Sequence, residues 1–417
     1  MTDVTLNQEN VEGTLLHTLV SGGEVIGYVA VDSTINGRSC GGLRMLPDVG
    51  AAEVVGLARA MTLKYGFLGL PQGGAKGGVR GDPEAPVDGR RSTLARFANG
   101  VAPLLRDGTY APHPDMGTCA ADVAAMLQSI GLRPGRRAVQ DHDSGYYTAV
   151  SVAAAALAAL RRLGLLPVNC RAAIEGFGKV GRPLARLLDQ AGLKIVAVST
   201  RLGAIYDPLG LDVSRLLHLS AKLGSALLDG YPEAKRISTA ELLELPVELL
   251  SPCARHHSLH GGNAPRLLCR LISAGANNPA TPEAERILAA RGVLCLPDFV
   301  SNCGGVLGGT MEFAGIPHGK ITELINLGME HSLASLLELA ENRGVAPRVV
   351  AEELACERFE IFKQAAENPN AAARLLRAGL TMHRHGLIPA RLVGLLAPAY
   401  FRKLPFFTPG GSTEPRA

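Results

Sequence analysis

The sequence contains no tryptophan, and aromatic residues make up only 4% of its 417 residues. Charged residues amount to 19%, and Lys and Arg are scattered along the chain, with a formal net charge of +4. This pattern has no basic stripe that would indicate binding to nucleic acid or to an anionic membrane surface. We therefore expect neither a nucleic-acid partner nor a membrane partner.

Long apolar runs are missing as well, since none reaches the roughly 20 residues that a membrane-spanning helix needs. The first residues, MTDVTLNQENVEGT, have neither a basic start nor an apolar core of signal-peptide length. The eight cysteines, spread from Cys40 to Cys356 without a CxxC pair, suit reduced thiols better than a disulfide framework or a zinc site. These features together predict a cytoplasmic protein.

Two histidine-rich segments place imidazoles close enough along the chain to suggest a metal site. HHSLH (256–260) has no carboxylate at ligand spacing and only Cys253 as a nearby cysteine, and MHRHG (382–386) is typical of a surface or a helix end. We therefore expect no metal site.

The length exceeds what one hydrophobic core usually serves, and 47% of the residues are hydrophobic, which predicts a globular chain of two domains. Residues 24–31, EVIGYVAV, run like a strand, and apolar residues recur at helical spacing over 51–69. The glycine-rich stretch LPQGGAKGGVRGDP (70–83) follows that helix, and we expect it to be a loop.

The second half of the sequence predicts an α/β fold with a parallel, helix-covered sheet. A long buried helix is expected from residue 144 until Gly164 and Pro167 end it. A strand, glycine turn, helix and strand follow over 170–200, and further β and α segments continue to about residue 310. Beyond 320 the pattern is helical again, and the last stretch, FFTPGGSTEPRA, predicts a frayed tail.

The turn in this unit is GFGKVG (176–181), a G-x-G-x-x-G placed directly after an apolar strand and at the start of a helix. Its first two glycines allow a tight turn and close approach to a pyrophosphate, which the helix N-terminus would stabilise. We therefore expect nucleotide binding, with a plain glycine turn as the alternative. The candidate contacts are Gly176, Phe177, Gly178, Lys179, Val180 and Gly181.

The next strand ends in Ser199, Thr200 and Arg201, where NAD enzymes commonly carry a carboxylate that binds the adenosine ribose. Without a carboxylate a 2′-phosphate is not repelled, and Arg201 could pair with it. Thr200 and Arg201 are therefore candidate cofactor contacts, and NADP is slightly favoured over NAD. The alternative is that Arg201 is simply solvated at a strand end.

Seven ordered blocks carry a resemblance to a known family. They are DSTINGRSCGGLRM (32–45), MTLK (61–64), LPQGGAKGG (70–78), PHPDMGT (112–118), GFGKVG (176–181), GANNPATPEA (275–284) and PDFVSNCGGV (297–306). The sequence resembles the amino-acid dehydrogenases that act on glutamate, leucine, phenylalanine and valine, and its first block is closer to the leucine and phenylalanine branch. The resemblance implies NAD(P)-dependent oxidative deamination of an L-amino acid to a 2-oxo acid and ammonia, or the reverse reaction, in a homo-oligomer.

The resemblance also assigns roles to individual residues. Lys64 matches the lysine that binds the substrate α-carboxylate, Lys76 the catalytic lysine, and Asp115 the aspartate that passes a proton to or from the amino group. These residue types suit the chemistry, because a carboxylate needs a fixed cation and a lysine becomes a base when burial lowers its pKa. Taken alone, Lys64 could be a solvated helix-end cation and Asp115 a turn or N-cap residue.

On the cofactor side, Ser144 matches a residue near the nicotinamide, and Asn277 and Asn302 match asparagines that meet the nicotinamide ribose or amide and the substrate region. Asn302 is expected at the carboxyl end of a strand, where open α/β sheets bind ligands. Each asparagine could instead fix a loop.

Two positions bear on the substrate. Glutamate enzymes of the family usually place a lysine immediately before GGLR and a serine after the NxGGV block, whereas this sequence has Cys40, followed by Gly41, and Gly309. An acidic side chain would lose its polar contacts there, so an apolar substrate is favoured. Glutamate dehydrogenase activity remains an alternative, as does a non-catalytic nucleotide-binding regulator, which would be expected to lose Lys64, Lys76 or Asp115.

The expected domains are a substrate, catalytic and oligomerisation domain over 1–140 and a Rossmann-type NAD(P)-binding domain over 141–325. C-terminal helices over 326–405 are expected to pack back on the first domain, with a tail over 406–417. The substrate is expected to lie in the cleft, where domain closure would exclude water.

Overall fold

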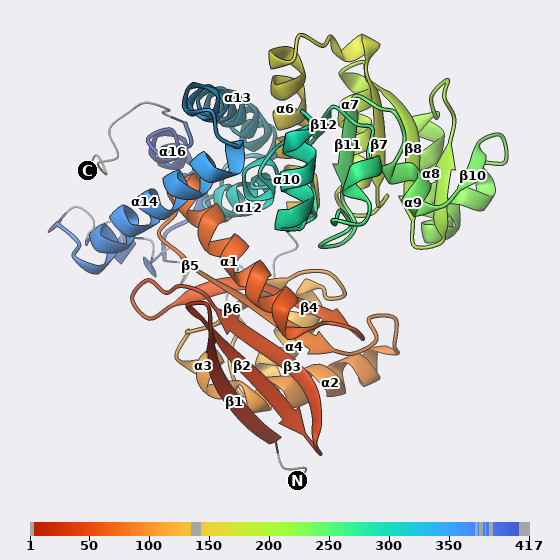
Figure 1. The fold of residues 1–417 in the computed structure, drawn as a ribbon. Coiled ribbons are helices and arrows are strands. Elements are labelled where there is room, and N and C mark those ends of the chain that lie inside the picture. The colour runs from red at the N-terminus through yellow and green to blue at the C-terminus, as the bar shows by residue number, and fades with distance from the viewer. Residues whose placement is uncertain are drawn as a thin grey trace. The chain divides into compact units, whose positions relative to one another are not determined.

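The computed structural model describes residues 4–134, 143–371, 374, 378–379, 381–382 and 387–407. They form an α/β fold with two sheets (Figure 1). The chain divides into two compact units. The first comprises the described residues within 1–142 and 354–396, and the second those within 143–353 and 397–411.

The first unit holds a six-stranded sheet in the order β1-β2-β3-β5-β4-β6. Its strands are β1 (Val4–Val11), β2 (Thr14–Ser21), β3 (Glu24–Val31), β4 (Ser39–Leu46), β5 (Gly73–Arg80) and β6 (Ala111–Pro114). From β1 to β5 the neighbours in the sheet are antiparallel, whereas β4 is parallel to both β5 and β6. The sheet is therefore mixed, with its parallel part at β5, β4 and β6.

Helices cover both faces of this sheet. Helix α1 (Ala51–Leu68) packs on one face through Val54 and Ala58. The other face packs in a separate core against α2 (Val87–Gly100), α3 (Ala102–Arg106) and α4 (Ala120–Ser129). Strand β3 and helix α1 confirm the elements predicted at 24–31 and 51–69, and α1 ends where Gly69 adopts a left-handed φ of 72°.

The glycine-rich stretch after α1 is not the loop that we expected. Residues 73–80 form β5, which lies between β3 and β4 and is almost wholly buried. A Cβ added at Gly74 would lie 2.4 Å from the backbone nitrogen of Thr62, and one at Gly78 would lie 2.7 Å from Val54. The strand needs glycines because α1 packs directly on it, and glycine is otherwise rare in strands, which made the sequence pattern misleading.

The second unit holds a seven-stranded sheet in the order β10-β9-β8-β7-β11-β12-β13. Its strands are β7 (Arg171–Glu175), β8 (Lys194–Thr200), β9 (Gly203–Tyr206), β10 (Lys235–Ile237), β11 (Leu249–Pro252), β12 (Leu271–Ile272) and β13 (Leu294–Cys295). The five strands from β8 to β13 along the sheet are parallel, as predicted, and β9 and β10 add an antiparallel edge.

The helices of this unit are α6 (Ser144–Arg162), α7 (Gly181–Gln190), α8 (Val213–Leu223), α9 (Thr239–Leu243), α10 (Pro282–Ala290), α11 (Asp298–Ser301), α12 (Gly304–Phe313) and α13 (His318–Arg343). Short 3-10 helices span Pro167–Asn169, Gly224–Gly230 and Ala264–Arg266. The long helix expected from residue 144 is α6, and the unit predicted over 170–200 is β7, α7 and β8. Helices α9 and α10 share a core with β7 and β11 on one face of the sheet.

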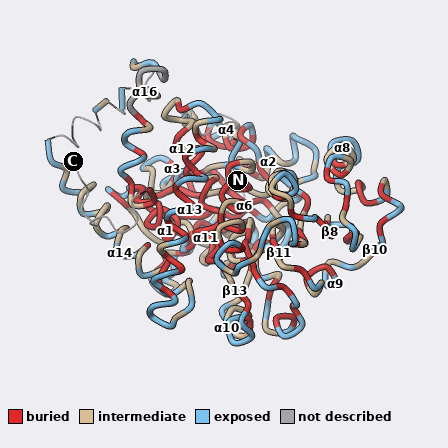
Figure 2. Tube along the Cα trace, turned by 90° about the horizontal axis from the view of Figure 1, so that it is seen from above, coloured by how far each residue is buried: buried red, intermediate tan, exposed pale blue. Residues whose placement is uncertain are grey.

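The C-terminal helices divide between the two units. Helix α13 belongs to the second unit and packs beside α6, and buried residues recur along both helices (Figure 2). Helix α14 (Pro347–Glu367) starts in the second unit and continues in the first, where Arg358 donates to the Phe67 carbonyl oxygen at 2.9 Å. Packing on the first domain, expected for all of 326–405, thus holds for the described residues within 354–396, whereas α13 and residues 397–405 belong to the second unit.

The predicted tail begins later than residue 406. Phe406, which follows α16 (Ala390–Phe401), is fully buried, and a Cβ added at Gly328 of α13 would lie 2.2 Å from its ring. The Ser332 hydroxyl also donates to the Phe406 carbonyl oxygen at 2.5 Å. Residues 408–417, and residues 383–386 of the MHRHG segment, lie outside the described residues.

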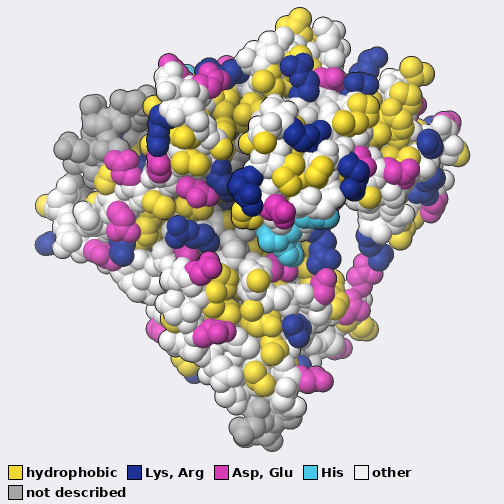
Figure 3. Space-filling model, in the orientation of Figure 1, with side chains coloured by type: hydrophobic (Ala, Val, Ile, Leu, Met, Phe, Trp, Pro, Cys, Tyr) yellow, Lys and Arg dark blue, Asp and Glu magenta, His cyan; other side chains and the backbone are white. Residues whose placement is uncertain are grey.

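Two surface properties complete the description. Among the helices that the structure describes, none combines the length and apolar character needed to cross a membrane. On the face seen in Figure 3, Lys and Arg side chains are interspersed with Asp and Glu.

Candidate active site

Lys76 lies in the middle of β5 and is only 2% exposed. Gly42, on the neighbouring strand β4, makes room for it, because a Cβ added there would lie 2.8 Å from the Lys76 Nζ. A charged side chain in the centre of a buried strand needs a compensating partner.

Asp115 is that partner. It directly follows β6, and its Oδ2 lies 2.5 Å from the Lys76 Nζ. Its backbone N–H donates to the Thr118 hydroxyl at 3.0 Å, and that hydroxyl donates to the carbonyl oxygen of Leu43 on β4 at 2.7 Å. Helix α4 is capped at Cys119, so the alternative that Asp115 is its N-cap is wrong.

Arg44 and Glu53 complete the cluster, and sequence reasoning missed both as functional residues. The Arg44 Nε donates to Asp115 Oδ2 at 3.2 Å, and its Nη1 forms a buried ion pair with Glu53 of α1. One sequence feature could have indicated Arg44, namely a charged residue within the otherwise apolar strand β4. Glu53 lies in the first turn of α1, and its burial is visible only in the structure. Two cations and two carboxylates therefore balance in this site.

The electrostatics distinguish the roles of Lys76 and Asp115. Burial and the charge of Arg44 lower the pKa of Lys76, although Asp115 opposes this. Burial would raise the pKa of Asp115, but the charges of Lys76 and Arg44 hold that pKa well below its usual range. For Arg44, burial is outweighed by Asp115 and Glu53, which raise its pKa. Asp115 is thus an ionised acceptor, and Lys76 is the group prepared to exchange a proton.

Lys64 lies on α1 and is 4% exposed, so it is not the solvated helix-end cation of the alternative interpretation. Cys40, at the start of β4, is also buried. Its thiol lies 2.7 Å from the Tyr65 hydroxyl and 3.1 Å from Gln72 Oε1. The glycine at position 41 is explained by packing, because an added Cβ would lie 1.6 Å from the Ala75 carbonyl oxygen.

The glycine turn lies in the second unit, at the carboxyl end of β7. Gly176 has a φ of 92°, which favours glycine, and its N–H donates to the Ser199 hydroxyl at 2.9 Å. A Cβ added at Gly181 would lie 2.0 Å from the Gly176 carbonyl oxygen, so helix α7 can start this close to the strand only with glycine there. These are the turn and the close helix packing that the motif predicts.

The turn also has room for a ligand. Gly178 and Lys179 are exposed, and a Cβ added at Gly178 would meet no described atom within 4 Å. In the described part of the chain no side chain caps α7 at Val180. The Arg182 N–H of its first turn already donates to the Gly178 carbonyl oxygen at 3.1 Å, and Pro183 has no N–H, so the glycine turn itself would supply much of the contact to an anion. The residues present fit a dinucleotide whose pyrophosphate rests on this helix end.

The residues expected to determine a preference for NAD or NADP lie at the end of β8. Ser199 is buried under the glycine turn. The Thr200 hydroxyl donates to the Ser225 carbonyl oxygen at 3.0 Å and accepts from the Leu202 N–H at 3.1 Å. Arg201 is exposed. Thr200 therefore organises the turn after β8, and Arg201 is the side chain that a ligand could reach.

Asn277 and Asn302 come together although they follow different strands. The Asn302 Nδ2 donates to Asn277 Oδ1 at 2.9 Å and to the Ala276 carbonyl oxygen at 3.0 Å. Asn302 ends the short helix α11, so it does not directly follow β13 as expected. Ser144 is exposed at the first residue of α6, and Gly309 lies on α12, where an added Cβ would meet no described atom within 4 Å.

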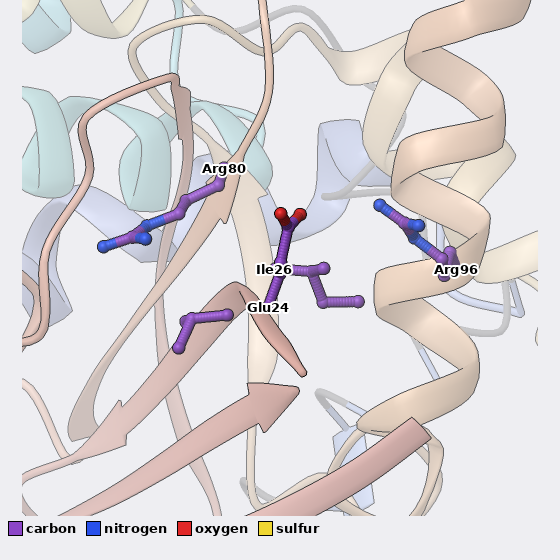
Figure 4. Close-up of a pocket in the computed structure, with 5 residues that line it drawn as sticks. Glu24, Ile26, Arg80 and Arg96 are labelled. Atoms are coloured by element: carbon purple, nitrogen blue, oxygen red, sulfur yellow. The ribbon is translucent and has the colours of Figure 1, made fainter. Parts of the chain in front are cut away.

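The predicted residues thus fall into two groups. Lys64, Lys76, Asp115 and Cys40 belong to the first unit, whereas the glycine turn, Ser144, Arg201, the two asparagines and Gly309 belong to the second. A hollow of about 440 Å³ in the first unit is lined by other residues, Glu24, Val25, Ile26, Arg80 and Arg96 (Figure 4). Arg80 is held there by the Tyr28 hydroxyl and the Val49 carbonyl oxygen, so we assign this hollow no function.

Comparisons with known proteins agree with this arrangement. A family model described as Glutamate/Leucine/Phenylalanine/Valine dehydrogenase matches residues 141–365, and one described as Glu/Leu/Phe/Val dehydrogenase, dimerisation domain, matches residues 20–131. The glutamate dehydrogenase of Thermotoga maritima is 36% identical over 293 residues, which cover 67% of this chain and 70% of that protein. The NAD-specific glutamate dehydrogenase of Staphylococcus aureus is 32% identical over 343 residues, 78% of this chain and 82% of that protein.

Solved structures share the fold. The hetero-hexameric glutamate dehydrogenase from Thermus thermophilus, in its Leu bound form, matches with a TM-score of 0.70 and 24% identity over 87% of this chain and 88% of that chain. The L-tryptophan dehydrogenase from Nostoc punctiforme matches with a TM-score of 0.57 and 24% identity over 86% of this chain and 97% of that chain.

The resemblance and the two-domain α/β fold predicted from the sequence are therefore confirmed. The two family matches contain Lys64, Lys76, Asp115 and the whole glycine turn. The chain belongs to the Glu/Leu/Phe/Val dehydrogenase family, and it is an amino-acid dehydrogenase that acts on CH–NH2 donors with NAD(P).

Proposed function

We propose that this enzyme interconverts an L-amino acid with an apolar side chain and the corresponding 2-oxo acid and ammonia. The observation that carries the proposal is the buried pair of Lys76 and Asp115 beside Arg44. Such a lysine, with a pKa lowered by burial, suits general acid–base catalysis.

In the oxidative direction, a nicotinamide coenzyme held at the glycine turn would supply the acceptor for the hydride of the substrate Cα–H, which would leave an iminium on the substrate. Lys76 takes a proton from the attacking water and stabilises the resulting carbinolamine by its charge. Asp115, held ionised by its two cationic neighbours, first takes a proton from the substrate ammonium group, and it later returns that proton to the departing amino group. Lys64 binds the substrate α-carboxylate, and its burial supports a fixed cation there.

The apolar side chain is supported by the surroundings of Cys40. Its thiol contacts the Tyr65 hydroxyl and Gln72, and a thiol presents no positive charge to a side-chain carboxylate. Gly309 leaves open space beside α12 for a larger side chain. The second candidate substrate is glutamate, which is favoured by the names of the curated relatives. A non-catalytic regulator is disfavoured because the Lys76 and Asp115 pair is intact.

We also propose a preference for NADP. Arg201 is exposed at the end of β8, and no acidic residue stands at positions 199–202 to repel a 2′-phosphate. The Staphylococcus aureus relative is named as NAD-specific, which favours the other cofactor. Replacing Arg201 with Ala should raise the KM for NADPH about 10-fold and leave the KM for NADH nearly unchanged. Arg236→Ala, at another exposed arginine, is the control. A strong preference of the wild type for NADH would contradict the proposed role of Arg201 in binding a 2′-phosphate.

The decisive experiment measures reductive amination of a panel of 2-oxo acids with ammonia and NADH or NADPH. We expect apolar 2-oxo acids to have the highest kcat/KM. Glutamate formation far above all other products would overturn the apolar preference. Lys76→Ala serves as the mechanistic control and should lose at least about 100-fold in kcat, so undiminished turnover would contradict the proposed chemistry.

We further propose a cytoplasmic homo-oligomer. The match to a dimerisation domain over residues 20–131 supports self-association. Light scattering of the purified chain should give a mass that is a multiple of 43.6 kDa, and a monomeric mass would contradict the proposal.

A further inference from the structure

Arg348, at the start of α14, is surrounded by carboxylates of the second unit. Its Nε lies 2.6 and 2.9 Å from the two oxygens of Glu285, and its Nη2 lies 2.7 Å from Asp298 Oδ1. A longer contact of 3.5 Å reaches Glu352. Asp298 is 1% exposed, so this ion pair is largely removed from solvent. A bidentate arginine is the side chain that can hold two carboxylates in a fixed geometry.

The second oxygen of Asp298 connects this cluster to the asparagine turn. Asp298 Oδ2 accepts the backbone N–H of Asn278 at 2.9 Å. Asn278 has a φ of 47°, in the left-handed region that residues other than glycine rarely adopt. The turn therefore depends on an external hydrogen bond, and Arg348 holds the acceptor of that bond in place.

The same carboxylate residue organises both candidate asparagines. The Asp298 carbonyl oxygen accepts the Asn302 N–H at 2.8 Å, while its side chain holds the residue that follows Asn277. The Asn302 Nδ2 then closes the arrangement on Asn277 Oδ1 at 2.9 Å. A displacement of Asp298 would move Asn277 and Asn302 together.

The glycine turn has separate support. It is held by the hydroxyl and carbonyl oxygen of Ser199, and a Cβ added at Gly145 of α6 would lie 2.6 Å from the Lys179 carbonyl oxygen. The carboxylates that bind Arg348 are not part of this support. The two halves of a dinucleotide would therefore depend on different side-chain networks.

We propose that Arg348 is a positioning residue for the nicotinamide half of the coenzyme. Through Asp298 it holds Asn277 and Asn302 in the arrangement that binds this half, and it does not affect the adenosine half. The inference rests on the proposed function, because it requires that the asparagine turn binds the coenzyme.

The test compares two ligands in the full-length protein. Dissociation constants for NAD(P)H and for ADP, or 2′,5′-ADP if NADPH is preferred, are measured by calorimetry for the wild type, Arg348→Lys and Arg348→Gln. Arg343→Gln is the matched control, since Arg343 makes a similar bidentate pair with Glu353 at 2.5 and 3.1 Å but is about half exposed. Lysine keeps the positive charge, so Arg348→Lys provides a folded variant if Arg348→Gln leaves the carboxylates unpaired and fails to fold.

We expect both Arg348 variants to bind NAD(P)H on the order of 10- to 100-fold more weakly, the range that follows from small misplacement of binding groups. ADP binding and the Arg343 variant should stay within about twofold of wild type. Unchanged NAD(P)H affinity in the Arg348 variants would overturn the inference, and so would an equal loss for ADP, which would mark a general structural role. A wild type that binds ADP but not NAD(P)H would overturn the proposed function itself.

Discussion

Lys76 of β5 and Asp115, which directly follows β6, meet across the strand that separates β5 from β6. Strand β4 lies between β5 and β6, and Gly42 of β4 is the position over which the Lys76 Nζ and the Asp115 Oδ2 approach to 2.5 Å. A Cβ added at Gly42 would lie 2.8 Å from the lysine nitrogen and 2.7 Å from the Asp115 Cβ. The absence of one side chain on β4 thus makes this close pair possible.

Gly42→Ala should therefore separate the pair. We expect kcat/KM to fall about 100-fold, because a shift of about 1 Å in catalytic groups has an effect of this size. Gly89→Ala, at an exposed position of helix α2, is the control, since a Cβ there meets no described atom within 4 Å, and its activity should match the wild type. Steady-state kinetics on the best 2-oxo acid measure both. Full activity of Gly42→Ala would show that the pair tolerates separation.

The pH dependence of the reaction should respond to Arg44. Its charge lowers the pKa of Lys76, so removing it should raise that pKa and move the acidic limb of the kcat/KM profile for oxidative deamination to higher pH. The double variant Arg44→Gln and Glu53→Gln is used because it leaves neither partner as an unpaired buried charge. Glu53→Gln alone measures the effect of Glu53, whose charge weakly raises the pKa of Lys76 and so opposes Arg44. An acidic limb that stays in place would argue that Lys76 is not the titrating base.

Glu175 should make folding stability fall as pH rises. This buried carboxyl accepts the Ser258 hydroxyl at 2.8 Å, and burial raises its pKa from 4.5 to about 6. The folded state then binds its proton more tightly than the unfolded state, so the destabilisation is absent below pH 4.5 and complete above pH 6.

Glu175→Gln keeps the acceptor for Ser258 and removes the titration. It should be about 2 kcal/mol more stable than the wild type at pH 8 and equal to it near pH 4, by the usual conversion of a pKa shift. Urea unfolding at both pH values measures this, with the exposed Glu9→Gln as control. A variant with the same stability difference at both pH values would point to packing as the cause.

Phe406 should anchor the chain end to α13. Its ring is fully buried against Gly328, so Phe406→Ala should lower the free energy of unfolding by about 3–5 kcal/mol. Leu209→Ala, at a residue that is 82% exposed, should change it by less than about 0.5 kcal/mol. Chemical denaturation followed by circular dichroism compares the two variants, and equal stabilities would show that the chain end is not anchored.

Much of the fold could be predicted from the sequence, because periodic apolar residues and turn glycines act on near neighbours. The strand at 24–31, the helices α1 and α6 and the unit of β7, α7 and β8 are of this kind. Strand β5 could not be predicted in this way. Its glycines are explained by α1 lying against it, which is a contact between elements and leaves no periodic signal within the strand itself.

The sequence by itself determined the family, through ordered blocks that contain Lys64, Lys76, Asp115 and the glycine turn. Only the tertiary structure decided how these groups are charged. The pKa of Lys76 depends on Arg44 and Asp115, which lie on separate elements and are brought within 3.2 Å or less of one another only when β4, β5 and β6 pair. Burial and Coulomb energy depend on distances in space, and distance along the chain does not specify them.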